Sequence, residues 1–116
     1  GDFGAAHVFV AAETTTVIDW DSCRAADPAE DGGRFIASLW HLAARGCITR
    51  DDAAAAARRF RDAYAAVRPQ LAARLPFYAA LACLRKAARL ARHGERQQHQ
   101  AEALLTAGQA EIGGAL

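Results

Sequence analysis

Three polar side chains stand among apolar and small residues at the start of the chain: Asp2, His7 and Asp19. A carboxylate can orient a hydroxyl group and accept its proton, and its hard oxygen atoms can also bind a divalent cation. Asp19 lies between Ile18 and Trp20, where a charged group without a partner would be costly to bury. We therefore expect Asp19 either to be satisfied by local hydrogen bonds or to bind a positively charged ligand.

A β-hairpin is predicted to position these side chains. The run HVFVA at 7–11 is short and apolar, and the run TTVIDW at 15–20 is β-branched and apolar, so each is typical of a strand. Residues 13–15, where the two runs meet, are polar enough to form a turn. Such a hairpin would present acidic groups at its ends.

The same stretch resembles a known catalytic sequence. GDF at 1–3 and VIDWD at 17–21 are similar to the H-G-D-x-x-x-x-N and I-D-[WF] motifs of the aminoglycoside phosphotransferase and choline kinase-like family, within the protein-kinase-like superfamily. The segment DPAEDGGRFIASL at 27–39 resembles the family pattern D-P-A-x-D-[LVG]-G-x-F-[LI]-A. Specific motifs thus cover about the first 45 residues, and the remainder is similar in helical pattern only.

The resemblance implies a role for each matching residue. Asp2 would be the catalytic base, and Asp19 would bind the Mg²⁺ that bridges the phosphates of ATP. His7 stands where the family has Asn, so it would be a metal ligand of an unusual kind, since imidazole suits Zn, Cu or Fe better than Mg²⁺. It could instead hold the loop that carries Asp2. Asp27 and Asp31 would support the catalytic loop, with Asp31 accepting its backbone N–H bonds.

Helices are predicted to follow the hairpin. Asp27 and Pro28 are typical of a helix start and Gly46 of a helix end, which predicts a first helix between them. Gly32 and Gly33 inside this helix cost about 1 kcal/mol each relative to Ala. Close packing against the backbone of the catalytic loop would explain them.

The rest of the chain is also expected to be helical. Further helices are predicted over 49–67, 76–92 and 98–112, with a short turn at 69–75 and a polar linker at 93–100. The predicted fold class is therefore mainly α (α+β). A β-hairpin that carries the catalytic motifs is followed by four to five helices, resembling the C-terminal lobe of a protein-kinase-like fold.

The composition limits the class of protein. With 116 residues the chain forms one domain at most, and its formal net charge of +1 argues against a dedicated nucleic-acid-binding protein. No signal peptide is visible at its start, and it contains no charge-free run of about 18 apolar residues, so we expect no membrane partner and a cytoplasmic location. Cys23, Cys47 and Cys83 lack Cys-x-x-Cys spacing, so we expect reduced thiols in the core.

These observations predict a function for the chain. Residues 1–116 would be the C-terminal catalytic and substrate lobe of a phosphotransferase that uses ATP and Mg²⁺ to phosphorylate the hydroxyl of a small molecule. The sequence has no Gly-rich phosphate loop, strand lysine or partner glutamate. We therefore expect that the N-terminal nucleotide-binding lobe is absent and that the 116 residues alone are inactive.

Two points stay open. Acidic residues are scarce after Asp52, which weakens the aminoglycoside substrate that the family name suggests, because a cationic aminosugar would suit an acidic lining. The alternative function is a non-catalytic helical interaction module, or a degenerate remnant of a kinase that keeps the hairpin as a scaffold.

Overall fold

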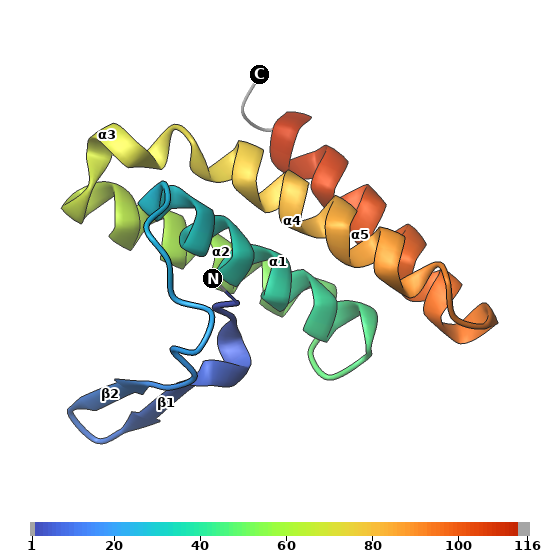
Figure 1. The fold of residues 1–116 in the computed structure, drawn as a ribbon, viewed down its shortest axis with the longest axis horizontal. Helices are drawn as coiled ribbons and strands as arrows, with labels where there is room; N and C mark the ends of the chain where they lie inside the picture. Colours follow the sequence, from blue (N-terminus) through green and yellow to red (C-terminus); the bar gives the residue numbers. More distant parts are fainter. Residues whose placement is uncertain (1, 114–116) are drawn as a thin grey trace.

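The computed structural model describes residues 2–113 and is mainly helical, with a small antiparallel sheet that precedes the long helices (Figure 1). The predicted order of a hairpin followed by helices is confirmed. The elements are a short 3₁₀ helix η1 (Ala5–His7), strands β1 (Val8–Ala11) and β2 (Thr14–Val17), and helices α1 (Pro28–Ala44), α2 (Arg50–Val67), α3 (Pro69–Ala72), α4 (Leu75–Leu90) and α5 (Glu95–Gly113).

The hairpin projects from the helices at one end of the molecule (Figure 1). Its strands pair from Val8 opposite Val17 to Ala11 opposite Thr14, so a two-residue turn joins them. The strand predicted through residue 20 was too long. Asp19 has a φ of +65°, in the left-handed region, and a regular strand cannot continue through that conformation.

The ends of the first two long helices are where the sequence predicts them. The side chain of Asp27 accepts a hydrogen bond from the N–H of Ala29 at 3.0 Å and so caps α1. Gly46 has a φ of +76° just after α1, a conformation in which glycine carries no steric cost. Thr49 caps α2 by accepting the N–H of Asp52 at 3.0 Å.

The later helices differ slightly from the prediction. α5 starts at Glu95, so most of the predicted polar linker is helical. Glu, Arg and Gln are good helix formers, which is why polarity alone did not mark a loop. Across residues 2–113, none of the helices combines the length and the apolar character needed to cross a membrane.

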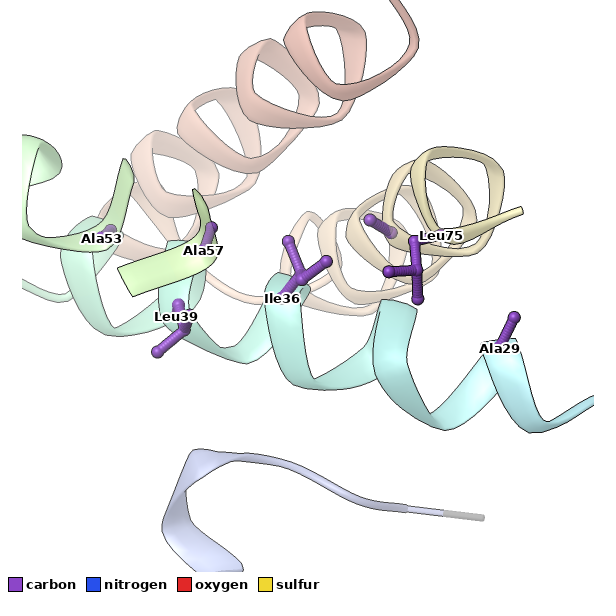
Figure 2. Close-up of a cluster of buried hydrophobic side chains, with 7 residues drawn as sticks. Ala29, Ile36, Leu39, Ala53, Ala57 and Leu75 are labelled. Carbon is purple, nitrogen blue, oxygen red and sulfur yellow. The ribbon is translucent and has the colours of Figure 1, made fainter. Parts of the chain in front are cut away.

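The core combines alanine with leucine and isoleucine side chains from packed helices. Figure 2 shows the first of two buried clusters, in which side chains of α1 point towards α2 and α4. A second cluster joins α1 and α4 to α5, and it includes Cys83, whose burial raises its pKa to about 12. The first cluster consists of Ala29, Ile36, Leu39, Ala53, Ala57, Leu75 and Ala79.

Cys23 and Cys47 are exposed, so the expectation that all three thiols are core residues was wrong.

Gly32 and Gly33 pack against α4, and not against the catalytic loop as expected. A Cβ atom at Gly33 would lie 2.4 Å from the Cβ of Tyr78 and 2.6 Å from the backbone N of Ala79. A Cβ atom at Gly32 would lie 2.6 Å from Cδ2 of Leu75. The two glycines therefore let α1 and α4 approach more closely than any side chain would permit.

A buried carboxylate connects the last helix to the first two. Glu111 of α5 is 5% exposed and is the buried charged residue found within the described range. It accepts a hydrogen bond from Trp40 Nε1 of α1 at 2.8 Å and pairs with the guanidinium of Arg61 of α2. Arg61 is therefore a partner in the core, whereas its neighbours Arg58 and Arg59 are exposed.

Replacing Glu111 is expected to destabilise the fold. Glu111→Ala leaves Trp40 Nε1 and Arg61 without their partner, so the free energy of unfolding should fall by about 2 to 3 kcal/mol, measured by urea denaturation. Glu102→Ala, at an exposed position of the same helix, is the control and should change it by less than about 0.5 kcal/mol. Equal effects of the two substitutions would show that the buried network contributes nothing.

Candidate functional site

Asp2 and Asp19 line one cavity of about 230 Å³. Asp31, from the first turn of α1, lines the same cavity. The fold thus brings together three of the acidic residues that the sequence singled out. The cavity is formed by the N-terminal loop, the end of β2, the loop that follows it and the start of α1, and its remaining lining residues are Phe3, Val17, Ile18, Trp20, Ser22, Cys23 and Arg24.

The loop that carries Asp2 is held by the middle of α1. The ring of Phe3 stacks on the ring of Phe35, with centroids 5.5 Å apart and planes at 21°. The N–H of Ala5 donates to Ser38 Oγ at 2.8 Å, and that hydroxyl donates to the carbonyl of Phe35 at 2.6 Å. A stacked ring on one side of Asp2 and a hydrogen bond further along the loop therefore fix the position of its backbone.

The aromatic contact continues into the core. Phe35 packs against Phe60 of α2 at 4.5 Å between centroids, and Phe60 packs against Tyr64 at 5.8 Å. Neither Phe35 nor Ser38 was singled out from the sequence. A serine inside an apolar helix face was the available signal, because a partly buried hydroxyl needs a hydrogen-bond partner.

Asp19 is presented by an unusual backbone conformation at the end of β2. Its positive φ is uncommon for a residue other than glycine, although aspartate tolerates it better than most. On one side, the N–H of Ile18 donates to the carbonyl of His7 at 3.0 Å. On the other, Trp20 Nε1 donates to the carbonyl of Val17 at 3.1 Å. These two bonds hold the turn in which the Asp19 carboxylate stays 43% exposed.

His7 is the neighbour of Asp19. Its Nε2 lies 3.4 Å from Asp19 Oδ2, and its Nδ1 is buried without a hydrogen-bond partner in the described part of the chain. The imidazole is thus in position to orient the carboxylate when Nε2 carries a proton and donates to Oδ2. Whether His7 also binds a metal, as the resemblance implies, stays a prediction.

Asp27 connects α1 with α4. Besides capping α1, its carboxylate accepts a hydrogen bond from the hydroxyl of Tyr78 at 3.1 Å and lies 3.3 Å from Arg74 Nε. Asp27 is not among the residues that line the cavity of Asp2. It fixes the start of the helix that carries Ser38. The direct support of the catalytic loop by Asp27 or by Asp31 stays a prediction.

The charge of the cavity suits a cation. Three carboxylates and one guanidinium, that of Arg24, line it. Arg24 is held by Glu30 through two hydrogen bonds of 2.8 and 2.9 Å, so its charge is largely compensated. Carboxylates therefore outnumber cations among the described side chains that line the cavity.

The donor set is compatible with Mg²⁺ bound together with phosphate. Between residues 2 and 113, no group of three or more His, Cys, Asp or Glu side chains is arranged to hold a metal ion. Mg²⁺ usually needs only one or two protein carboxylates when substrate phosphates and water complete its shell. Asp19 satisfies that requirement, and the second predicted ligand, His7, is a poorer match for a hard cation.

The serine that contacts the N-terminal loop gives a direct test of how this loop is held. Ser38→Ala leaves the N–H of Ala5 without its acceptor, so we expect a loss of about 1 kcal/mol in the free energy of unfolding. Amide hydrogen exchange at Ala5 should also become faster, which NMR can measure. Thr106→Ala is the control, because that exposed hydroxyl donates only within its own helix. Unchanged exchange at Ala5 would contradict the anchoring role.

Comparisons with models of known protein families, with curated proteins and with solved structures found no match. The evidence about function is therefore in the site itself. An acidic cavity contains two aspartates from distant positions of the chain, one on a loop fixed by α1 and the other in a strained turn at the end of β2.

Proposed function

We propose that this chain is the catalytic and substrate-binding lobe of an ATP-dependent phosphotransferase that acts on the hydroxyl of a small molecule. The observation that carries the proposal is the shared cavity of Asp2 and Asp19. Phosphoryl transfer requires a carboxylate for the hydroxyl and a second carboxylate for the metal, both within reach of one phosphate. The resemblance of the flanking sequences supports the same assignment.

Asp2 would position the acceptor hydroxyl and take its proton. In the reaction, the substrate oxygen forms a bond to the γ-phosphorus of ATP, the bond from that phosphorus to the β–γ bridging oxygen breaks, and ADP leaves. The proton of the hydroxyl moves to the Asp2 carboxylate. The stacking of Phe3 on Phe35 holds the Asp2 backbone in place, so little reorganisation is needed during the reaction.

Asp19 would hold the metal end of the site. Mg²⁺, when bound there, neutralises phosphate charge and lowers the repulsion felt by the incoming oxygen. The exposed Asp19 carboxylate faces the same cavity as Asp2, and His7 would keep it oriented. The left-handed backbone of Asp19 is also the kind of local strain that concentrates at functional sites.

The alternative, a non-catalytic interaction module, has an observation of its own. The hairpin and the segment after it expose large apolar side chains: Phe9 is 55%, Val10 74% and Trp20 65% exposed. Such a surface favours contact with another protein element. A nucleotide-binding lobe of the phosphotransferase and an unrelated partner would both satisfy it, so catalysis is the property that separates the two functions.

The catalytic assignment of Asp2 is tested by conservative substitution in the protein that the intact gene encodes. Asp2→Asn should lower the rate of phosphate transfer from γ-labelled ATP to small hydroxylated compounds by about a hundredfold or more, because a general base contributes that much. Its thermal midpoint should be unchanged. Asp62→Asn, at an exposed position of α2, is the matched control. Full activity of Asp2→Asn, or no transfer by the unaltered protein, would favour the interaction module.

His7→Asn tests the metal site separately. An amide oxygen is a harder ligand than imidazole, so we expect a higher rate and half-maximal activity at a lower Mg²⁺ concentration. His7→Ala removes the side chain without offering a new ligand and should show neither gain. An Mg²⁺ dependence identical in all three proteins would mean that position 7 does not contact the metal.

A further inference from the structure

A second cavity, of about 220 Å³, shares Asp2 and Phe3 with the first. Its other walls come from α1 and α4, and four cationic side chains face it together with the single carboxylate of Asp2. Asp2 therefore stands between a cavity with an excess of carboxylates and a cavity with an excess of cations. The remaining lining residues are Arg34, Ala37, Ala82, Arg85, Lys86 and Arg89.

The cations of this cavity repel one another along α4. Arg85 and Arg89 are four residues apart and Lys86 and Arg89 are three apart, and like charges at these spacings destabilise a helix. Lys86 is only partly exposed. Burial and the charge of Arg89 lower its pKa, while the carboxylate of Asp2 acts in the opposite direction. An anion bound between these groups would relieve the repulsion.

The protein supplies few counter-charges. Glu30 lies 3.0 Å from Arg34 and 4.0 Å from Arg85, so one carboxylate serves both. In the described part of the chain, no carboxylate forms an ion pair with Lys86 or with Arg89. The Nε of Arg34 is buried and also has no hydrogen-bond partner there. The hydrogen-bonding capacity of these cations is therefore not used up by the fold.

Stabilisation of the helix end does not account for the cluster. Basic side chains near the end of a helix interact favourably with its dipole, and Arg89 satisfies that rule in α4. Arg34 belongs to the first half of α1, where the rule gives no benefit. The cations also come from two helices and converge on one cavity, which an effect confined to a single helix end does not explain.

We propose that this basic cavity binds the anionic group of the substrate, a carboxylate or a phosphate, and so places the substrate hydroxyl at Asp2. The inference rests on the proposed function, whose substrate class it names. A compact hydroxylated acid or phosphate ester suits the cavity, which is smaller than the roughly 300–1,000 Å³ of sites for drug-sized ligands. A cationic aminosugar would be repelled, in agreement with the scarcity of acidic residues after Asp52.

Binding is measured by NMR titration of the chain at constant ionic strength. Four probes are used: glycerol 3-phosphate, glycerate, uncharged glycerol and cationic choline. We expect one or both of the anions to shift the backbone amides at positions 34, 82, 86 and 89, and the other two probes to leave them unchanged. The two anions separate phosphate recognition from carboxylate recognition. Equal responses to all four probes, or no response to either anion, would overturn the proposal.

The charge requirement is tested with a matched pair of variants. Lys86→Gln combined with Arg89→Gln should weaken binding of the anion by about tenfold or more, because charge-assisted hydrogen bonds are lost. Arg58→Gln combined with Arg59→Gln removes the same amount of charge from exposed positions of α2, and this pair should leave the affinity for the anion unchanged. Equal weakening by both pairs would reduce the effect to net charge and overturn the proposal. If the first pair does not fold, Arg85→Gln with Arg89→Gln, both at exposed positions, replaces it.

Two further measurements separate this inference from the proposed function. Asp2→Asn should bind the anion at least as tightly as the unaltered chain, because it removes a negative charge from the cavity. Anion binding that persists while the intact gene product shows no phosphate transfer would sink the proposed function and leave the site standing. Phosphate transfer to neutral compounds without anion binding would overturn the anion site and leave the proposed function standing. A stronger response of the same amides to ADP than to either small anion would assign the cavity to the nucleotide and overturn the proposal.

Discussion

The attachment of the N-terminal loop to α1 is the constraint on which the candidate site depends. Asp2 belongs to no helix or strand, and its position is fixed by the contacts of its neighbours: the Phe3 ring on Phe35 and the Ala5 N–H on Ser38. A loop held through an aromatic stack and one partly buried hydrogen bond keeps its geometry only while the helix beneath it is itself fixed. The packing of α1 is therefore part of the site, although none of that packing touches the cavity.

α1 is fixed from several directions. Gly33 lets it meet α4 at backbone distance, its N-cap residue Asp27 bonds to Tyr78 of α4, and Trp40 connects its second half to Glu111 of α5. The first two contacts join the first half of α1 to α4, and the third joins its second half to α5. As a result the helix cannot slide or rotate without breaking several of them, and the loop above it inherits that rigidity.

Local sequence rules predicted the ends of elements better than the contacts between them. The Asp27 and Thr49 caps and the Gly46 terminus follow from the chemistry of a few neighbouring residues, so they could be predicted. Contacts between residues that are distant in the sequence could not be predicted in this way. The purpose of Gly32 and Gly33 was assigned to the wrong neighbour, and Ser38 and Glu111 were missed, because their partners are set by how the helices pack. Asp2 and Asp19 were singled out by residue type and received their expected roles from the resemblance, whereas the basic cavity on α4 required the fold.

The two faces of α4 serve different purposes. One face is buried in the core, and the other lines the second cavity. Cys83 and Ala87 are buried against α5, while Arg85 and Arg89 on the same turns are exposed towards the second cavity. Substitutions at the exposed positions can alter the charge next to Asp2 without creating a void in the core. The charge of the second cavity can therefore be changed independently of the packing that holds α4 against α5.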